Sequence, residues 1–169
     1  GISIYGPSAT NNVVIGNKIG VNISGTSVIS NYTGVGFFDD AHGNRIGGTG
    51  AAERNIISGN TREGVNLSSY GNEVTGNYIG TDVTGSNPLS NPESGIRIEN
   101  SAKDQIIGPD NLIAYSAYGV VIRDYNTVRN TIHRNWIYGH EVKGIWLTNN
   151  SNGNLAAPVL TGYPPLSGT

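Results

Sequence analysis

Residues 64–79 read GVNLSSYGNEVTGNYI, and this stretch decides the fold. It contains Gly-Val-Asn-Leu (64–67), then Asn-Glu-Val (72–74), then Asn-Tyr-Ile (77–79). Short segments with β-branched residues, separated by Gly, Ser and Asn, are typical of β-strands joined by sharp turns. Because successive side chains of a strand point to opposite sides, the two apolar residues of Gly-Val-Asn-Leu face the same side. The stretch therefore predicts three short strands in quick succession.

The same three segments recur along the chain with a period of 24 to 33 residues. The Gly-apolar-x-apolar segment begins at residues 1, 34, 64, 95, 119 and 144, and the other two begin at 12, 44, 72, 104 and 130, and at 17, 55, 77, 111 and 135. A fixed period of this size indicates a solenoid. We predict an all-β fold over residues 1–155: a single-stranded right-handed parallel β-helix of about six coils, with three short strands per coil. Residues 156–169 are expected to form a boundary or linker segment.

Stacking of the coils predicts two inward columns of apolar side chains. These are Ile2, Val35, Val65, Ile96, Val120 and Ile145, and Ile4, Phe37, Leu67, Ile98, Ile122 and Leu147. The recurring Asn residues are expected to occupy left-handed corners and to form internal hydrogen-bonded ladders from coil to coil. The Gly before each first strand is expected to have a positive φ. Two long insertions, at 20–33 and 80–94, follow the third strands of the first and third coils.

Composition excludes several classes of partner. The formal net charge is −2 and the charges are scattered, whereas nucleic acids and anionic membranes are bound by concentrated positive charge. No apolar run approaches the length of about 20 residues that a membrane helix requires. The chain has no Cys, which excludes disulfides and thiolate metal sites. We expect no nucleic-acid binding, no membrane insertion and no cofactor.

The motifs Gly-Ile-x-Ile, Asn-x-Val-x-Gly-Asn-x-Ile and Ile-Gly-Thr-Asp carry a family resemblance. The sequence resembles right-handed parallel β-helix repeat proteins of the pectin lyase-like superfold, and above all the repeat regions of large exported bacterial proteins, over about residues 1–150. The resemblance implies an extracellular or cell-surface location and flanking modules in a longer parent chain. The superfold contains polysaccharide lyases, hydrolases, epimerases, phage tailspikes and non-enzymatic adhesins, so the fold alone does not select an activity.

Two clusters of charged residues are candidates for chemistry. Asp39, Asp40 and His42 could bind calcium or act as acid and base, but they also form an ordinary corner sequence, and we predict no metal site. Arg97, Glu99 and Arg123 come from adjacent coils. They could neutralise the carboxylates of a uronate polymer, or they could form a cross-strand ion-pair lattice.

Five aromatic residues gather in the last two coils: Tyr118, Tyr125, Trp136, Tyr138 and Trp146. Both Trp are predicted to point outward. Exposed rings on a repetitive face suit stacking against sugars, but they could equally pack beneath a neighbouring module.

These observations favour a non-catalytic repeat module of an exported protein, acting as a spacer or as a carbohydrate-binding surface. The residues expected to bind a polysaccharide are Trp136, Tyr138, Trp146, Tyr125, Arg97, Glu99 and Arg123. The alternative is a lyase, hydrolase or epimerase acting on uronate-containing glycans. A third possibility is self-association through the open coil ends or one flank of the rod.

Overall fold

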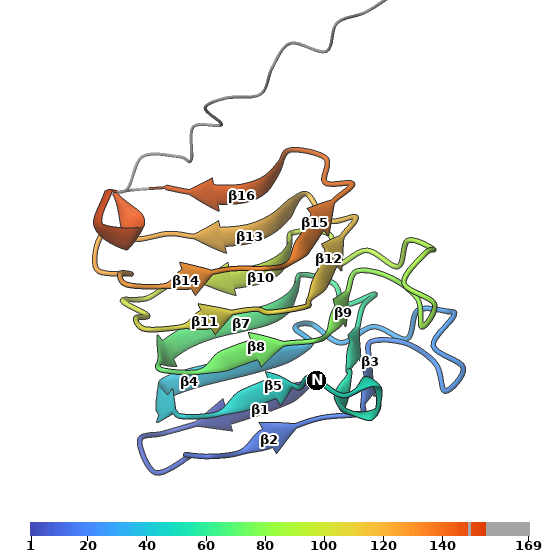
Figure 1. The fold of residues 1–169 in the computed structure, drawn as a ribbon, viewed down its shortest axis with the longest axis horizontal. Coiled ribbons are helices and arrows are strands. Elements are labelled where there is room, and N and C mark those ends of the chain that lie inside the picture. Colours follow the sequence, from blue (N-terminus) through green and yellow to red (C-terminus); the bar gives the residue numbers. More distant parts are fainter. Residues whose placement is uncertain (149, 155–169) are drawn as a thin grey trace, which may run out of the picture.

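The chain winds into a rod of stacked coils, as the computed structural model shows for residues 1–148 and 150–154 (Figure 1). The predicted boundary segment 156–169 lies outside these described residues. Each coil contributes one strand to each of three parallel sheets. The fold is therefore the predicted right-handed parallel β-helix with three short strands per coil.

The six-stranded sheet forms one side of the rod. It consists of β1 (Ile2–Tyr5), β4 (Val35–His42), β7 (Glu63–Tyr70), β10 (Ser94–Ile98), β13 (Tyr118–Ile122) and β16 (Lys143–Leu147). What we call the β2 sheet consists of β2 (Val13–Val14), β5 (Arg45–Gly47), β8 (Glu73–Thr75), β11 (Ile106–Ile107) and β14 (Thr131–Ile132). What we call the β3 sheet consists of β3 (Lys18–Ile19), β6 (Ile56–Ile57), β9 (Tyr78–Ile79), β12 (Leu112–Ala114) and β15 (Trp136–Tyr138).

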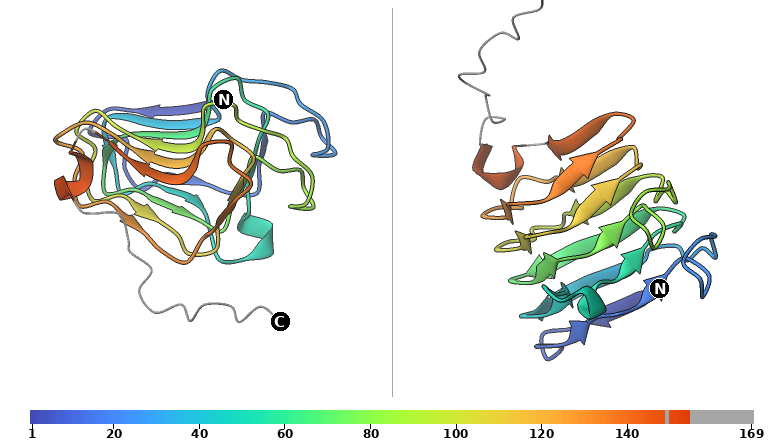
Figure 2. Two further views of the ribbon diagram at one scale, coloured as in Figure 1. Left: turned by 90° about the horizontal axis from the view of Figure 1, so that it is seen from above. Right: turned by 45° about the vertical axis from the view of Figure 1, so that its right-hand side comes forward.

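The described residues form five complete coils and the first strand of a sixth. Two short 3-10 helices, η1 (Ala51–Glu53) and η2 (Ser151–Asn154), lie at corners of the rod. No helix in the described part of the chain is long and apolar enough to cross a membrane. Both insertions leave the rod on the same flank (Figure 2).

The predicted inward columns are confirmed by the strand register. Ile2 pairs with Val35, Val35 with Val65, and the series continues to Ile145 at the top of the rod. The side chains of the middle coils are fully buried, whereas Ile145 is 43% exposed because the described residues place no further strand above it. The core is thus a continuous apolar column whose middle coils are fully buried.

The glycines that precede the first strands do not have positive φ, so that prediction is wrong. They are required by close packing instead. A Cβ on Gly64 would lie 2.7 Å from the Gly95 carbonyl oxygen and 2.8 Å from the Ile79 side chain, and Gly34 is in the same situation. At these positions any side chain larger than hydrogen would push the coils apart.

The predicted asparagine ladders are present at two corners. They run through Asn12, Asn44, Asn72, Gln105 and Asn130, and through Asn17, Asn55, Asn77, Asn111 and Asn135. The residue just before the ladder residue is left-handed in most coils, as at Gly43, Gly71 and Gly76, but not at Arg54. The ladder residues themselves were predicted to occupy the left-handed region, and that part of the prediction is wrong.

In the fourth coil, the second strand is shifted by one residue from its prediction. Gln105 takes the ladder position and Asp104 the left-handed one. Ile107 then points inward, whereas Ile106 is 44% exposed. The Asn-x-apolar pattern missed this because Asp104 and Ile106 mimic the spacing of the other coils.

A third ladder, at the corner before the six-stranded sheet, changes composition along the rod. It begins with Asn31, Asn60 and Asn91, which are linked by side-chain hydrogen bonds. Ser116 and His140 take the corresponding positions in the fourth and fifth coils. His140 has its Nδ1 3.2 Å from the Ser116 carbonyl oxygen and its Nε2 3.1 Å from the Ile113 carbonyl oxygen. Burial lowers the pKa of His140.

Candidate functional site

The outer face of the six-stranded sheet carries the most varied side chains of the rod. Its central outward column follows the strand register and consists of Ser3, Gly36, Asn66, Arg97, Val121 and Trp146. The lower end of this column has small residues and the upper end has large ones. This change in size produces a hollow at the lower end.

The hollow has a volume of about 360 Å³ and extends over β1, β4 and β7. It is lined by Gly1, Ser3, Tyr5, Tyr32, Thr33, Phe38, Arg62, Glu63 and Asn66. Along the strand direction, Tyr5 and Phe38 lie on one side, with ring centroids 4.8 Å apart and nearly parallel. Tyr32, which precedes β4, lies on the other side, and the guanidinium of Arg62 is 5.2 Å from the centre of its ring. The hollow therefore has aromatic residues on both sides.

The aromatic lining depends on Gly36. A Cβ at this position would lie 2.3 Å from the Phe38 ring, so the ring lies across the glycine. Ser3 is the neighbour of Gly36 on β1 and is also small. These two residues leave the space that a larger outward side chain would fill.

The floor of the hollow is polar and mostly buried. Glu63 is 1% exposed and accepts a hydrogen bond from the Thr33 hydroxyl at 3.0 Å. Asn66 is 8% exposed and donates its side-chain N–H to Glu99 at 2.9 Å. Tyr32 is 67% exposed, and its hydroxyl accepts a hydrogen bond from Arg62 at 3.0 Å. Sugar-binding sites combine exposed rings with fixed hydrogen-bonding groups in this way.

Six charged side chains form what we call the ion-pair belt, which begins inside the hollow with its first two members and continues above it: Arg62, Glu63, Glu93, Arg97, Glu99 and Arg123. Arg62 donates two hydrogen bonds to Glu93, at 2.6 and 3.0 Å. Arg97 donates to Glu93 at 2.7 Å and also pairs with Glu63. Arg123 pairs with Glu99 on the neighbouring strand. Three arginines and three glutamates thus neutralise one another.

The pairing fixes the protonation state of Glu93. Hydrogen bonds from Arg62 and Arg97 lower the pKa of this carboxyl to about 2. Glu93 is therefore ionised at neutral pH and has no proton to donate as a general acid. Glu63 and Glu99 each have an arginine partner as well.

Three of the predicted site residues belong to the belt. Glu99 and Arg123 are brought together as an ion pair, whereas Arg97 pairs with two glutamates that the sequence did not single out. Trp146 lies on the same face and stacks on Tyr118, with ring centroids 4.5 Å apart. The upper end of this face therefore carries a second aromatic pair.

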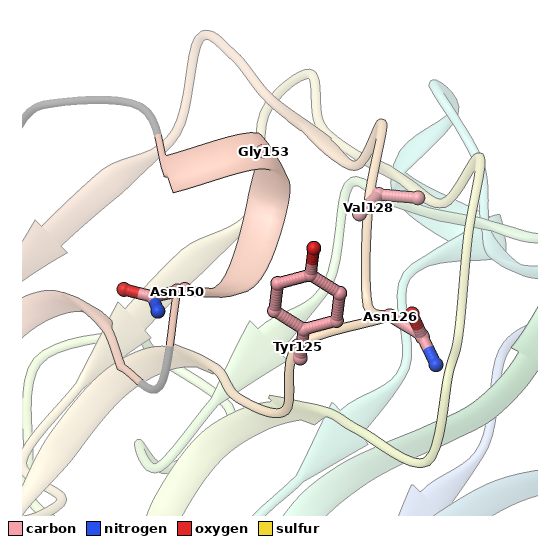
Figure 3. Close-up of a pocket in the computed structure, with 5 residues that line it drawn as sticks. All are labelled: Tyr125, Asn126, Val128, Asn150 and Gly153. Atoms are coloured by element: carbon pink, nitrogen blue, oxygen red, sulfur yellow. The ribbon is translucent and has the colours of Figure 1, made fainter.

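The other three predicted residues lie elsewhere. Trp136 and Tyr138 are on β15, in the β3 sheet. Trp136 is 61% exposed, and the Tyr138 hydroxyl donates to the Gly85 carbonyl oxygen of the second insertion at 3.4 Å. Tyr125 lies at the corner between β13 and β14, in a separate pocket of about 420 Å³ that is also lined by Asn126, Val128, Asn150 and Gly153 (Figure 3). The four aromatic residues that were predicted to bind polysaccharide thus do not form one surface.

Sequence reasoning missed Tyr5, Tyr32, Phe38 and Arg62. Tyr5 and Phe38 could have been found, because both occupy the outward position just after the second inward residue of the first strand. Tyr32 gives no such signal, since it belongs to an insertion and not to the repeat.

The described residues do not bring together three or more His, Cys, Asp or Glu side chains that could hold a metal ion. Asp39 and Asp40 both have positive φ and form an irregularity in β4. The ring of His42 stacks on Tyr70 at 4.6 Å, and its Nδ1 is 2.9 Å from the Asp40 carbonyl oxygen. This corner is thus built from backbone turns and ring stacking.

Comparisons with known proteins place the chain in a family. No curated protein and no solved structure matches it. The model of the family described as "Periplasmic copper-binding protein (NosD)" matches residues 4–143, which is most of the chain. The protein therefore belongs to the NosD family.

Proposed function

We propose that this chain is a non-catalytic module of an exported protein, and that the hollow on its six-stranded sheet binds carbohydrate. The observation that carries the proposal is the hollow itself, which has Tyr5 and Phe38 on one side, Tyr32 on the other, and a buried polar floor. The family description names the periplasm, which supports a location outside the cytoplasm.

Binding is favoured over catalysis by the state of the carboxylates. Glycoside hydrolysis uses two carboxyl groups, of which one must be protonated to act as the acid. The glutamates beside the hollow are all paired with arginines, and the pKa of Glu93 is lowered to about 2. A lyase acting on uronates would need its arginines for the substrate, but here they are occupied by protein carboxylates.

The copper in the family description does not fit the donors of this chain. Soft sulfur ligands suit Cu(I), and the chain has no Cys and no Met. Imidazole also binds copper, but the described residues bring no three His, Cys, Asp or Glu side chains together as a metal site. We therefore assign no copper site to these residues.

A glycan array followed by calorimetry with the best ligands tests the proposal. We expect binding that is lost in the double variant Tyr5→Ala/Phe38→Ala. Trp136→Ala is the matched control, because it removes an exposed ring from a different sheet. Absence of binding to any glycan, or equal loss in the control, would refute the site.

The same proteins should be incubated with pectate, alginate and glycosaminoglycans. We expect no unsaturated products and no new reducing ends. Appearance of either product would replace the proposal with the alternative of a uronate-acting enzyme.

A further inference from the structure

We infer that the ligand of this face is an uncharged polysaccharide whose chain crosses the strands of this sheet, from the hollow to the Tyr118–Trp146 stack. This inference rests on the proposed function and adds the substrate class and the direction of binding. It is carried by the neutrality of the ion-pair belt and by the positions of the two aromatic pairs.

The ion-pair belt offers no free positive charge to an acidic chain. Arg62 is held by Glu93 through two hydrogen bonds, and Arg97 contacts both Glu93 and Glu63. A uronate carboxylate would have to break these pairs, and it would then lie close to the glutamates that it displaced. Like charges at such distances repel one another, so the face disfavours polyuronates.

Sugar hydroxyls meet no such obstacle. A hydroxyl group both donates and accepts, so it can donate to a carboxylate oxygen and accept from a guanidinium without disturbing an ion pair. Glu63 and Asn66 on the floor, and Arg62 and Tyr32 at the side, supply both kinds of partner. The hollow is thus chemically matched to neutral pyranose rings.

The direction follows from the strand order. Tyr5 and Phe38 lie on β1 and β4, and Tyr118 and Trp146 lie on β13 and β16 of the same sheet. Between β4 and β13 are only β7 and β10, which makes the gap about 14 Å at about 4.8 Å per strand. The ion-pair belt spans this gap. A chain that contacts both aromatic pairs must therefore cross the strands, and it does so obliquely, because Tyr118 lies nearer the N-terminal ends of the strands than Phe38 does.

The test is a calorimetric titration with oligosaccharide series: cellobiose to cellohexaose, xylobiose to xylohexaose, and mannobiose to mannohexaose, beside oligogalacturonates of the same lengths. We expect at least one neutral series to bind, with affinity that rises with length and is unchanged by added salt. Trp146→Ala should weaken the hexasaccharide about tenfold and leave the disaccharide unchanged, because only the longer chain reaches the upper pair. Tyr5→Ala/Phe38→Ala should weaken both, and Trp136→Ala neither.

The outcomes separate this inference from the proposed function. Tighter binding of oligogalacturonates, weakened by salt, would refute the neutral ligand but leave carbohydrate binding intact. A hexasaccharide unaffected by Trp146→Ala would refute the path across the strands to the upper aromatic pair. No binding of any series, together with a silent glycan array, would refute both proposals. Near-identical thermal unfolding of the variants and the parent checks that each variant is folded.

Discussion

The same coils contain two polar systems, one inside the rod and one on its outer surface, and they are built differently. The amide ladders are inside the corners, where each Asn bonds to the coil before it and to the coil after it. The ion-pair belt is outside, on the six-stranded sheet, and joins Arg62, Arg97 and Arg123 to three glutamates. The ladders use one residue type repeated in nearly every coil, whereas the belt uses six residues that occur once.

The difference indicates that the two systems have different roles: the ladders stabilise the rod, and the belt makes one region of its surface different from the rest. A neutral amide ladder can continue through any number of coils, because each added Asn provides both the donor and the acceptor that its neighbours need. Charges cannot repeat in this way, since a column of like charges would repel itself. An amide ladder can therefore extend along the whole rod, whereas an ion-pair network such as the belt is confined to a few coils.

The largest expected effect comes from breaking a ladder at its middle. Asn77 is fully buried, accepts from Asn55 and donates to the Ile46 and Thr75 carbonyl oxygens and to Asn111. Asn77→Ala should lower the free energy of unfolding by about 4 kcal/mol, because several buried groups lose their partners. Urea unfolding followed by circular dichroism measures this loss.

Asn17→Ala is the matched control for that variant. Asn17 is an exposed ladder residue in the first coil, so its replacement should cost less than about 1 kcal/mol. Equal losses at the two positions would show that the ladder is not the source of the stability.

The next effect concerns the belt. Arg97→Met removes the nearest charged partner of Glu63, whose side chain is 1% exposed, and leaves its buried carboxylate with only the more distant Arg62, at 3.5 Å. We expect a loss of about 3 kcal/mol in the free energy of unfolding. Arg129→Ala breaks the exposed pair with Asp104 and should change stability by less than about 0.5 kcal/mol in the same urea assay. Similar losses of unfolding free energy in the two variants would contradict the claim that burial makes the ion pairs of the belt important for stability.

Acid should weaken the belt before it affects the ladders. The pKa of Glu93 is lowered to about 2 from 4.5, so its ion pairs stabilise the native state fully above pH 4.5 and are lost as the pH falls toward 2. We expect the free energy of unfolding to fall by about 1 kcal/mol, because 39% of the Glu93 side chain is exposed and solvent screens its charge. Urea midpoints at a series of acidic pH values measure this loss. If Glu93→Gln leaves the change of the urea midpoint with pH unaltered, the loss of stability in acid comes from other carboxyl groups.

A smaller effect is expected where the third ladder changes from Asn to His. Burial lowers the pKa of His140 below its ordinary 6.5, so the unfolded chain takes up the proton first and stability falls as the pH drops below 6.5. His140→Asn restores the residue type of Asn60 and Asn91. It should remove less than about 1 kcal/mol of this pH dependence, as read from thermal unfolding between about pH 7 and pH 5. Persistence of the full dependence in the variant would exclude His140 as its cause.

Much of the fold could be predicted from sequence because it is periodic. The inward columns and the ladders repeat in every coil, so each coil supports the assignment of its neighbours. The predictions failed where a coil departs from the repeat, as at Gln105. They also failed where glycine is required for close packing and not for a positive φ, as at Gly34 and Gly64.

The candidate site was predicted only in part, for the same reason. Glu99 and Arg123 occupy equivalent positions in adjacent coils, so their pairing follows from the register. Glu93 lies at the end of an insertion and Tyr32 in another, and no repeat fixes where such residues fold back. The hollow arises from Ser3 and Gly36, whose small size gives no signal in a pattern of apolar residues.

The ladders also give the rod a direction. In the bonds that link one ladder amide to the next, the side-chain oxygen always accepts from the preceding coil, as from Asn12 to Asn44 and from Asn17 to Asn55. These small dipoles add along the axis instead of cancelling, so the two ends of the rod are chemically unlike.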